Sequence, residues 1–288
     1  MVKRYKKEAD GKLEIGQVLY TKKFKLTLDR DLCKSCELCK LICPRDAIEL
    51  VPNECEESKT LAPIVDIDEN KCDYHGICAV ICPFSAIRIS INGNEELPTV
   101  KMNVFPTLTR DIEVDTSLCE KGCKICQEVC PLNIVTVTEK KGEKTVEVDK
   151  ELCAACRICW MECPTDAIEV RKFIEGNIQI NSELCPKGCR NCLEVCPVDA
   201  VGVNDDGKLY AKDMYCIYCG ACRLVCPEEN ALFIERTAIL HSPIDSGAWH
   251  RGLEKVTSTR GLKRELSAEG TDKVRNAIKK LSLAEVKE

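Results

Sequence analysis

The chain has 288 residues, a net charge of -5 and 24 cysteines. Cysteine at this density indicates either a secreted disulfide scaffold or metal sites in a reducing compartment, and the acidic balance argues against nucleic acid as a partner. The first residues, MVKRYKKEAD, contain no apolar run typical of a signal peptide, and no stretch approaches the ~20 apolar residues of a membrane span. We therefore expect a soluble, cytoplasmic protein whose thiols bind metal.

The first part of the chain carries no cysteine. Residues 1–26 are mixed and basic, with one apolar cluster around Leu13, Ile15 and Val18, and we interpret them as an N-terminal extension that packs on a neighbouring domain or subunit. The alternation of apolar and polar residues in 25–29 then predicts a strand. This strand leads into the first cysteine run.

Six cysteine runs follow, and each ends in Cys-Pro. The run Cys153, Cys156, Cys159, Cys163 has the spacing C-x2-C-x2-C-x3-C-P of bacterial iron–sulfur proteins. The third and fifth runs share a variant, C-x3-C-x2-C-x3-C-P, with Lys-Gly inside it. Because this variant alternates with the plain spacing of the fourth and sixth runs, the repeat is two runs long, about 65 residues.

The segments between runs have a common pattern. A short apolar element follows each Cys-Pro, and turns are predicted at 141–142, 175–176 and 205–207, followed by a second alternating strand. The predicted unit is therefore a ligand loop, a short helix, a β-hairpin and the next ligand loop. The fold class is α+β, with three tandem bacterial-type two-cluster [4Fe-4S] modules, an N-terminal extension and a C-terminal helical tail.

The predicted boundaries place an N-terminal extension at 1–26, modules at 27–92, 111–174 and 175–238, a linker at 93–110 and a tail at 239–288. In the tail, helical spacing behind the candidate N-cap Thr271 indicates a docking helix, and the alternative is a solvated helix with a frayed end. The apolar positions at that spacing are Val274, Ala277, Ile278 and Leu281. His241 and His250 lie near no cysteine run and are interpreted as packing residues.

In a two-cluster ferredoxin, the fourth Cys of one run binds the cluster held by the other run. If consecutive runs pair, six sites result. Site 1 is Cys33, Cys36, Cys39 and Cys82; site 2 is Cys72, His75, Cys78 and Cys43; site 3 is Cys119, Cys123, Cys126 and Cys163; site 4 is Cys153, Cys156, Cys159 and Cys130; site 5 is Cys185, Cys189, Cys192 and Cys226; site 6 is Cys216, Cys219, Cys222 and Cys196. A nested pairing, with the first run joined to the sixth, stays open at this point.

Site 2 departs from the pattern because His75 stands where a thiolate belongs. Imidazole can bind cluster iron and raises its potential, as at Rieske centres. The second alternative is a [3Fe-4S] cluster that lacks the iron at this corner. In a third alternative, Asp73 or Cys55 is the fourth ligand. The default interpretation of Cys55, the one cysteine outside a run, is a free thiol.

Two other metal chemistries use similar spacings. Zinc ribbons use C-x2-C pairs that are usually well separated, whereas here four cysteines are compressed into one short run. The C-x3-C-x2-C spacing also resembles the radical S-adenosylmethionine signature, but a fourth Cys and a Pro follow at ferredoxin spacing. Six such runs favour iron–sulfur clusters over both alternatives. Because the sequence shows neither a Gly-rich flavin-binding loop nor an acid/base cluster, we do not expect the chain to be an enzyme in its own right.

With six runs and no other domain, the chain resembles the archaeal polyferredoxins of methanogens and related anaerobes over residues 27 to about 236. Together with the tail LHSPIDSGAW at 240–249, it looks most like the polyferredoxin subunit of formylmethanofuran dehydrogenase. The resemblance implies an electron-transfer subunit in methanogenesis, whose partners are other subunits of that enzyme or those of a heterodisulfide reductase or hydrogenase. A diffusible carrier is the alternative.

Overall fold

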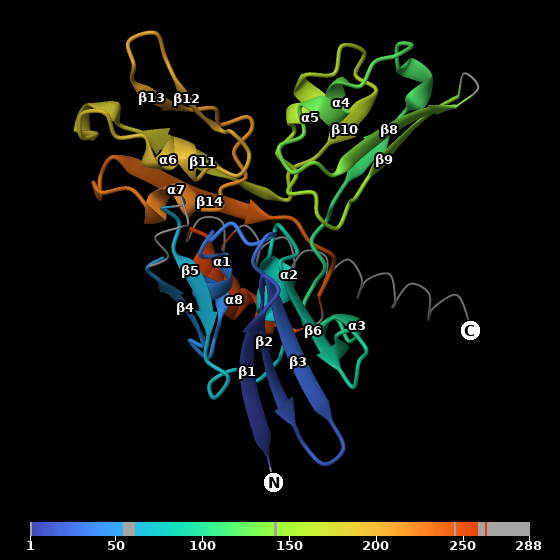
Figure 1. The fold of residues 1–288 in the computed structure, drawn as a ribbon, viewed down its shortest axis with the longest axis vertical. Helices are drawn as coiled ribbons and strands as arrows, with labels where there is room; N and C mark the ends of the chain where they lie inside the picture. The colour runs from blue at the N-terminus through green and yellow to red at the C-terminus, as the bar shows by residue number, and fades with distance from the viewer. Residues whose placement is uncertain (1, 54–60, 141–142, 245, 259–262, 264–288) are drawn as a thin grey trace, which may run out of the picture.

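The computed structural model describes residues 2–53, 61–140, 143–244, 246–258 and 263, and arranges them as three lobes that meet at the centre of the molecule (Figure 1). The first lobe lies at the bottom of the view, the second at the upper right and the third at the upper left. Each lobe contains a hairpin between two cysteine loops, and an outer pair made of its first and last strands. The repeat in sequence is therefore also a repeat in structure.

In the first lobe the outer strand pair is widened into a four-stranded antiparallel sheet of order β1-β2-β3-β6. Its strands are β1 (Lys3–Ala9), β2 (Lys12–Val18), β3 (Lys23–Asp29) and β6 (Ile87–Ile91). Alternate apolar side chains, among them Leu13, Ile15 and Leu26, point into the lobe and are almost fully buried. Strands β1 and β2 thus continue the sheet of the first lobe, because β2 pairs in regular register with β3 and β1 with β2.

The other elements of the first lobe surround its cysteine loops. The hairpin pairs Ile48 with Ile67 and Val51 with Ile64. Two short helices face each other, and a third lies in the segment that was predicted to be a linker. These elements are β4 (Ile48–Val51), β5 (Ile64–Ile67), α1 (Leu38–Ile42), α2 (Ile77–Ile81) and α3 (Pro98–Lys101).

The second and third lobes repeat this plan with fewer strands. In the second lobe, β7 (Ile112–Val114) pairs with β10 (Ile168–Val170), and the hairpin is β8 (Val135–Lys140) with β9 (Glu143–Val148). In the third, β11 (Ile174–Ile180) pairs with β14 (Leu232–Ile239), and the hairpin is β12 (Val201–Val203) with β13 (Leu209–Ala211). The helices are α4 (Ile125–Glu128), α5 (Ile158–Met161), α6 (Asn191–Glu194) and α7 (Ala221–Leu224), with 3-10 turns at Thr116–Leu118 and Ser182–Leu184.

The predicted turn at 175–176 is wrong. Glu175 and Gly176 lie inside β11, at a β-bulge where the register against β14 shifts. A Cβ on Gly176 would meet the carbonyl oxygen of Glu235 at 2.2 Å, so glycine is needed because a neighbouring backbone comes close. The run of 168–180 is therefore not a hairpin, since β10 closes the second lobe and β11 opens the third.

We expect Gly176→Ala to destabilise the third lobe by about 1–3 kcal/mol, because the new methyl group has to displace backbone rather than a side chain. Gly247→Ala is the matched control, since a Cβ there would meet only His250 Nδ1 at 3.9 Å. The thermal unfolding midpoint of the iron-loaded chain measures the difference. Equal midpoints for the two variants would show that the bulge is not a tight contact.

The chain returns to the first lobe after β14. Helix α8 (Ala248–Val256) buries Trp249, Leu253 and Val256, and its Gly252 lies against Ile42 and Ile77 of α1 and α2. His241 lies edge-on to Trp249, with ring centroids 5.4 Å apart, and His250 is buried in the same helix. The predicted tail positions Thr271, Val274, Ala277, Ile278 and Leu281 lie outside the described residues.

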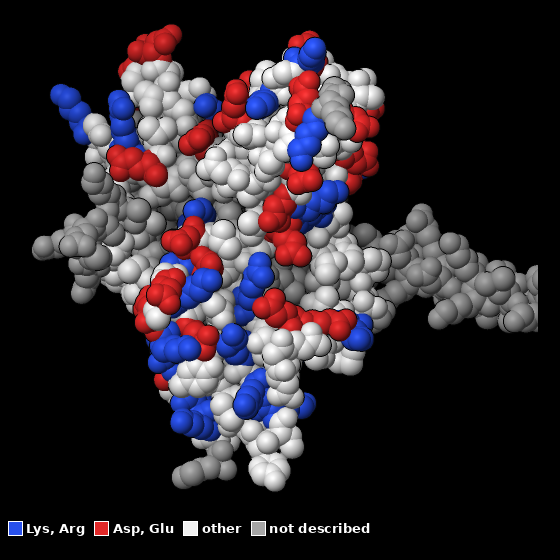
Figure 2. Space-filling model, turned by 45° about the vertical axis from the view of Figure 1, so that its right-hand side comes forward, with Lys and Arg blue, Asp and Glu red and all other residues white. Residues whose placement is uncertain are grey.

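Charged side chains of both signs are interspersed over the face drawn in Figure 2. Several pair on the strands of the first lobe, such as Lys6 with Asp66 and Arg30 with Glu8. Exposed pairs of this kind contribute little stability, so the sheet depends on its buried apolar face. Among the residues described, every helix is too short or too polar to span a bilayer.

Candidate iron–sulfur sites

In each lobe the helix of one cysteine run packs against the helix of the next, as α1 on α2, α4 on α5 and α6 on α7. This brings consecutive runs together. Three cavities are each lined by one complete predicted set: Cys43, Cys72, His75 and Cys78 at site 2, Cys119, Cys123, Cys126 and Cys163 at site 3, and Cys130, Cys153, Cys156 and Cys159 at site 4.

The thiols of the other three sites lie within electrostatic reach of one another. At site 1, burial and then the charges of Cys219, Cys82 and Cys39 raise the pKa of Cys36. Burial first, and Cys82 in addition, raise the pKa of Cys33. At site 5 burial first, and then neighbouring thiols that include Cys226, raise the pKa of Cys185 and Cys192. At site 6 burial first, then the neighbouring thiols Cys219 and Cys196, raise the pKa of Cys216 to about 12.

The loop after the fourth Cys of a run has one repeated conformation. A polar residue with positive φ, as at Asp46, Ser85, Asp166 and Asp199, turns the chain back towards the cysteine. Short polar side chains tolerate this left-handed region better than most. The next residue then donates its backbone N–H to the Sγ, as Ala86 does to Cys82 at 3.3 Å and Ala200 to Cys196 at 3.2 Å. Such bonds favour a thiolate, the form that binds iron.

The chemistry of these side chains fits iron–sulfur clusters. Burial raises the pKa of Cys72 and Cys156 to about 11, and burial with neighbouring thiols raises that of Cys159 to about 12. Several thiolates confined in one buried place need a cationic partner, and iron supplies it. The cysteines of the described residues are all free, and no three His, Cys, Asp or Glu side chains among them surround a single metal ion. The ligands of a cluster bind separate irons and so stand further apart.

At site 2 the imidazole of His75 lines the same cavity as the thiols of Cys72, Cys78 and Cys43. The N–H of Ile77 donates to Nδ1 at 3.3 Å, whereas buried Nε2 has no hydrogen-bond partner and lies 3.7 Å from a carboxylate oxygen of Asp73. Burial lowers the pKa of His75, which favours the neutral imidazole, and only a neutral imidazole can bind iron. Cys55 lies outside the described residues.

The segment 93–110 fixes His75 in place. Thr99 donates from its hydroxyl to the carbonyl oxygen of His75 at 3.0 Å, and the ring of Phe105 stands edge-on to the imidazole at 5.7 Å. A Cβ on Gly76, which has a φ of 93°, would meet the side chain of Leu97 at 2.5 Å. The expected linker therefore packs against the loop that carries His75.

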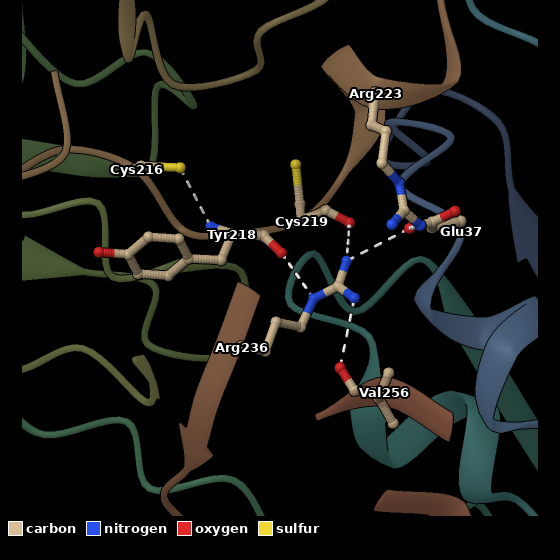
Figure 3. Close-up of polar contacts among 7 residues, drawn as sticks. All are labelled: Glu37, Cys216, Tyr218, Cys219, Arg223, Arg236 and Val256. Atoms are coloured by element: carbon tan, nitrogen blue, oxygen red, sulfur yellow. Dashed lines mark hydrogen bonds and ion pairs between the residues drawn. The ribbon is translucent and has the colours of Figure 1, made fainter. Parts of the chain in front are cut away.

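The first and third lobes meet directly between sites 1 and 6 (Figure 3). Glu37, which lies between Cys36 and Cys39 and is only 5% exposed, forms ion pairs with Arg223 and Arg236 of the third lobe. Arg236 also donates from Nε to the carbonyl of Tyr218 at 2.7 Å and from a terminal nitrogen to that of Cys219 at 2.9 Å. The thiols of Cys36 and Cys219 interact electrostatically across this contact.

These bridging residues were missed by the sequence interpretation. Glu37 offered a weak signal, because a carboxylate inside a cysteine run has to be compensated when the run is buried. Arg236 lies within an ordinary alternating strand, and nothing in the local sequence distinguishes it from an exposed arginine.

Comparisons with known proteins find 4Fe-4S domains in this chain. A family model described as a 4Fe-4S dicluster domain matches residues 118–167, a second of the same description matches 184–232, and a 4Fe-4S binding domain matches 26–49. No curated protein sequence matches the chain. A solved chain of the formate dehydrogenase–heterodisulfide reductase–formylmethanofuran dehydrogenase complex from Methanospirillum hungatei is similar, with 29% identity and a TM-score of 0.79 over 89% of this chain and 92% of that one.

Each lobe thus contains one of the matched segments, and each segment coincides with cysteine loops that the fold brings together. The structural likeness extends over nearly the whole length of both chains. The chain is therefore an iron–sulfur protein of three ferredoxin-type 4Fe-4S domains, and its role is electron transfer.

Proposed function

We propose that the chain is a polyferredoxin subunit that relays low-potential electrons between redox enzymes, to or from formylmethanofuran dehydrogenase in an anaerobic archaeon. The observation that carries the electron-transfer role is the grouping of the cysteine runs into sites that approach one another within the second and third lobes and, at Cys36 and Cys219, between the first and third lobes. The partner is inferred from the similar chain, which was solved in a complex that contains formylmethanofuran dehydrogenase. The chain itself then performs no substrate chemistry.

In this proposal sites 1 to 6 hold six clusters, with ligands as assigned from the spacing and His75 as the non-Cys ligand of site 2. The clusters supply one-electron chemistry at potentials set by charge, hydrogen bonds and solvent exposure. The residues of the chain position the thiolates and exclude water. At site 4, for example, the apolar side chains of Ile112, Val135 and Ile168 complete the wall of the cavity.

Iron and acid-labile sulfide analysis of the anaerobically purified chain tests the sites. Six four-iron clusters give about 24 irons per chain, whereas about 23 irons with an oxidised three-iron signal in low-temperature electron paramagnetic resonance would mean that His75 does not bind iron. Fewer than about 12 irons, with full folding, would contradict the proposal.

The partner is tested separately. Anaerobic size-exclusion of native extract should show the chain co-eluting with other redox subunits at a mass far above its own 32.2 kDa. Antibody capture followed by mass spectrometry should then recover formylmethanofuran dehydrogenase subunits. Elution near 32 kDa would favour the second candidate function, a diffusible carrier. Recovery of hydrogenase or heterodisulfide reductase subunits alone would identify one of those enzymes as the partner instead.

Replacing His75 tests the unusual ligand. We expect His75→Ala to lose one iron per chain and to gain a three-iron signal, while His75→Cys keeps four irons and lowers the potential of that site, because a thiolate adds negative charge. Iron analysis and resonance spectra at defined potentials measure both. Spectra of His75→Ala identical to the parent would show that the imidazole only lines the cavity.

A further inference from the structure

Arg110 joins the first and second lobes at the point where two cysteine loops meet. One terminal guanidinium nitrogen donates to the carbonyl oxygens of Pro83 and Cys153. The other terminal nitrogen donates to the carbonyl oxygen of Cys82 at 3.2 Å and to the hydroxyl of Ser85. Cys82 belongs to site 1 and Cys153 to site 4. A single side chain therefore contacts the backbone of ligands at two sites in different lobes.

The charge of Arg110 faces thiolates rather than carboxylates. Burial lowers the pKa of Arg110, and the largest opposing contributions come from Cys153 and Cys82, ahead of Glu151 and Asp149. Within the described part of the chain, Arg110 makes no ion pair with Asp or Glu. Its other neighbour is the ring of Phe173, whose centroid lies 5.2 Å from the guanidinium carbon. The positive charge thus acts most strongly on Cys153 and Cys82, with smaller contributions from Glu151 and Asp149.

Lys172 has the same relation to sites 4 and 6. Its ammonium donates to the carbonyl oxygen of Asp213 at 2.8 Å and stands over the ring of Tyr218. Burial lowers the pKa of Lys172, whereas Cys216 of site 6, then Asp213 and then Cys156 of site 4 raise it. Two junctions between lobes therefore each contain a half-buried cation between two cysteine sites.

We propose that Arg110 is a positioning residue for electron transfer between lobes, which holds one positive charge against both site 1 and site 4 and raises the reduction potentials of the two together. An added electron makes a cluster more negative, so a nearby cation stabilises the reduced form. Because one charge acts on both sites, its removal should shift both potentials in the same direction. This inference rests on the proposed iron–sulfur sites.

The test is potentiometry of the iron-loaded chain, monitored by electron paramagnetic resonance. In Arg110→Gln we expect two of the six reduction steps to move to more negative potential, with a tenfold lower ratio of reduced to oxidised sites, which is 59 mV for a one-electron couple. Arg110→Lys keeps the charge and should restore both steps. Arg171→Gln is the control, because Arg171 is exposed and pairs with Asp111 and Glu169.

Iron content separates the possible failures. A parent chain that lacks the expected iron would contradict the proposed function itself. Full iron in Arg110→Gln with all steps unchanged, or an equal shift in Arg110→Lys, would overturn the role of the charge. If Arg110→Gln does not retain iron, Arg110→Met provides the same test, because it removes the charge and keeps an unbranched side chain: two steps shifted to more negative potential support the inference, and unshifted steps overturn it.

Discussion

Removing iron and sulfide is expected to unfold the second and third lobes while the sheet of the first lobe persists. The second lobe has a small apolar core, in which Ile112, Val135, Val137, Ile168 and Val170 surround cysteine loops. Domains of this size need a metal or disulfide staple, and the binding free energy of a structural metal is then folding free energy. The first lobe has the four-stranded sheet and α8 in addition.

Hydrogen exchange detected by mass spectrometry measures this difference. After anaerobic chelation, amide protection in β8, β9, β12 and β13 should fall at least about a hundredfold, a loss of roughly 2.7 kcal/mol, whereas β2 and β3 should lose far less. The iron-loaded chain taken through the same buffers without chelator is the control. Uniform loss over all three lobes would contradict an independently stable first lobe, and full protection would show that the clusters are not structural.

The grouping of the cysteines could be derived from the sequence because it follows from local spacing. Three cysteines in one loop have to share a site, and the two-run repeat restricts the donor of the fourth ligand. Neither β1 nor β2 was predicted as a strand, since KRYKKEA has no apolar alternation and the apolar residues of KLEIGQV were interpreted only as a cluster. Strand β1 forms because β2, already paired with β3 on one side, can hydrogen-bond with it along its other edge. Gly176 was assigned to a turn for a similar reason: glycine signals both turns and close backbone contacts, and only the neighbouring strand distinguishes them.

The arrangement of the lobes could not be predicted. The contact between sites 1 and 6 depends on Glu37 and Arg236, which are far apart in the sequence and belong to different repeats. The contact between sites 1 and 4 depends on Arg110, in a segment interpreted as a linker. Such single contacts leave no periodic trace in the sequence. They decide which cysteine loops of different lobes lie next to one another.

Glu37→Gln is expected to loosen the first lobe from the third and to destabilise the chain by about 3 kcal/mol, at the low end for breaking a buried ion pair. Glu37 and Arg236 are 5% and 6% exposed, so loss of the carboxylate leaves Arg236 charged and buried. The Arg223 side chain is 43% exposed, so water compensates it in part, and Arg223→Gln should cost only about 1 kcal/mol. The two lobes also pack closely at this contact, because a Cβ on Gly220 would lie 2.8 Å from a carboxylate oxygen of Glu37.

Denaturant unfolding of the iron-loaded chain gives the free energies, and hydrogen exchange in 216–220 localises the loss. Glu49→Gln is the control, because Glu49 pairs with Lys71 on the surface and its replacement should change stability by less than about 1 kcal/mol. A double-mutant cycle of Glu37→Gln with Arg223→Gln should show coupling, since both act through one carboxylate. Additive losses, or equal effects of the Glu37 and Glu49 replacements, would mean that this contact does not hold the lobes together. If it does, loosening it separates Cys36 from Cys219, and electron exchange between the first and third lobes should slow while iron content stays unchanged.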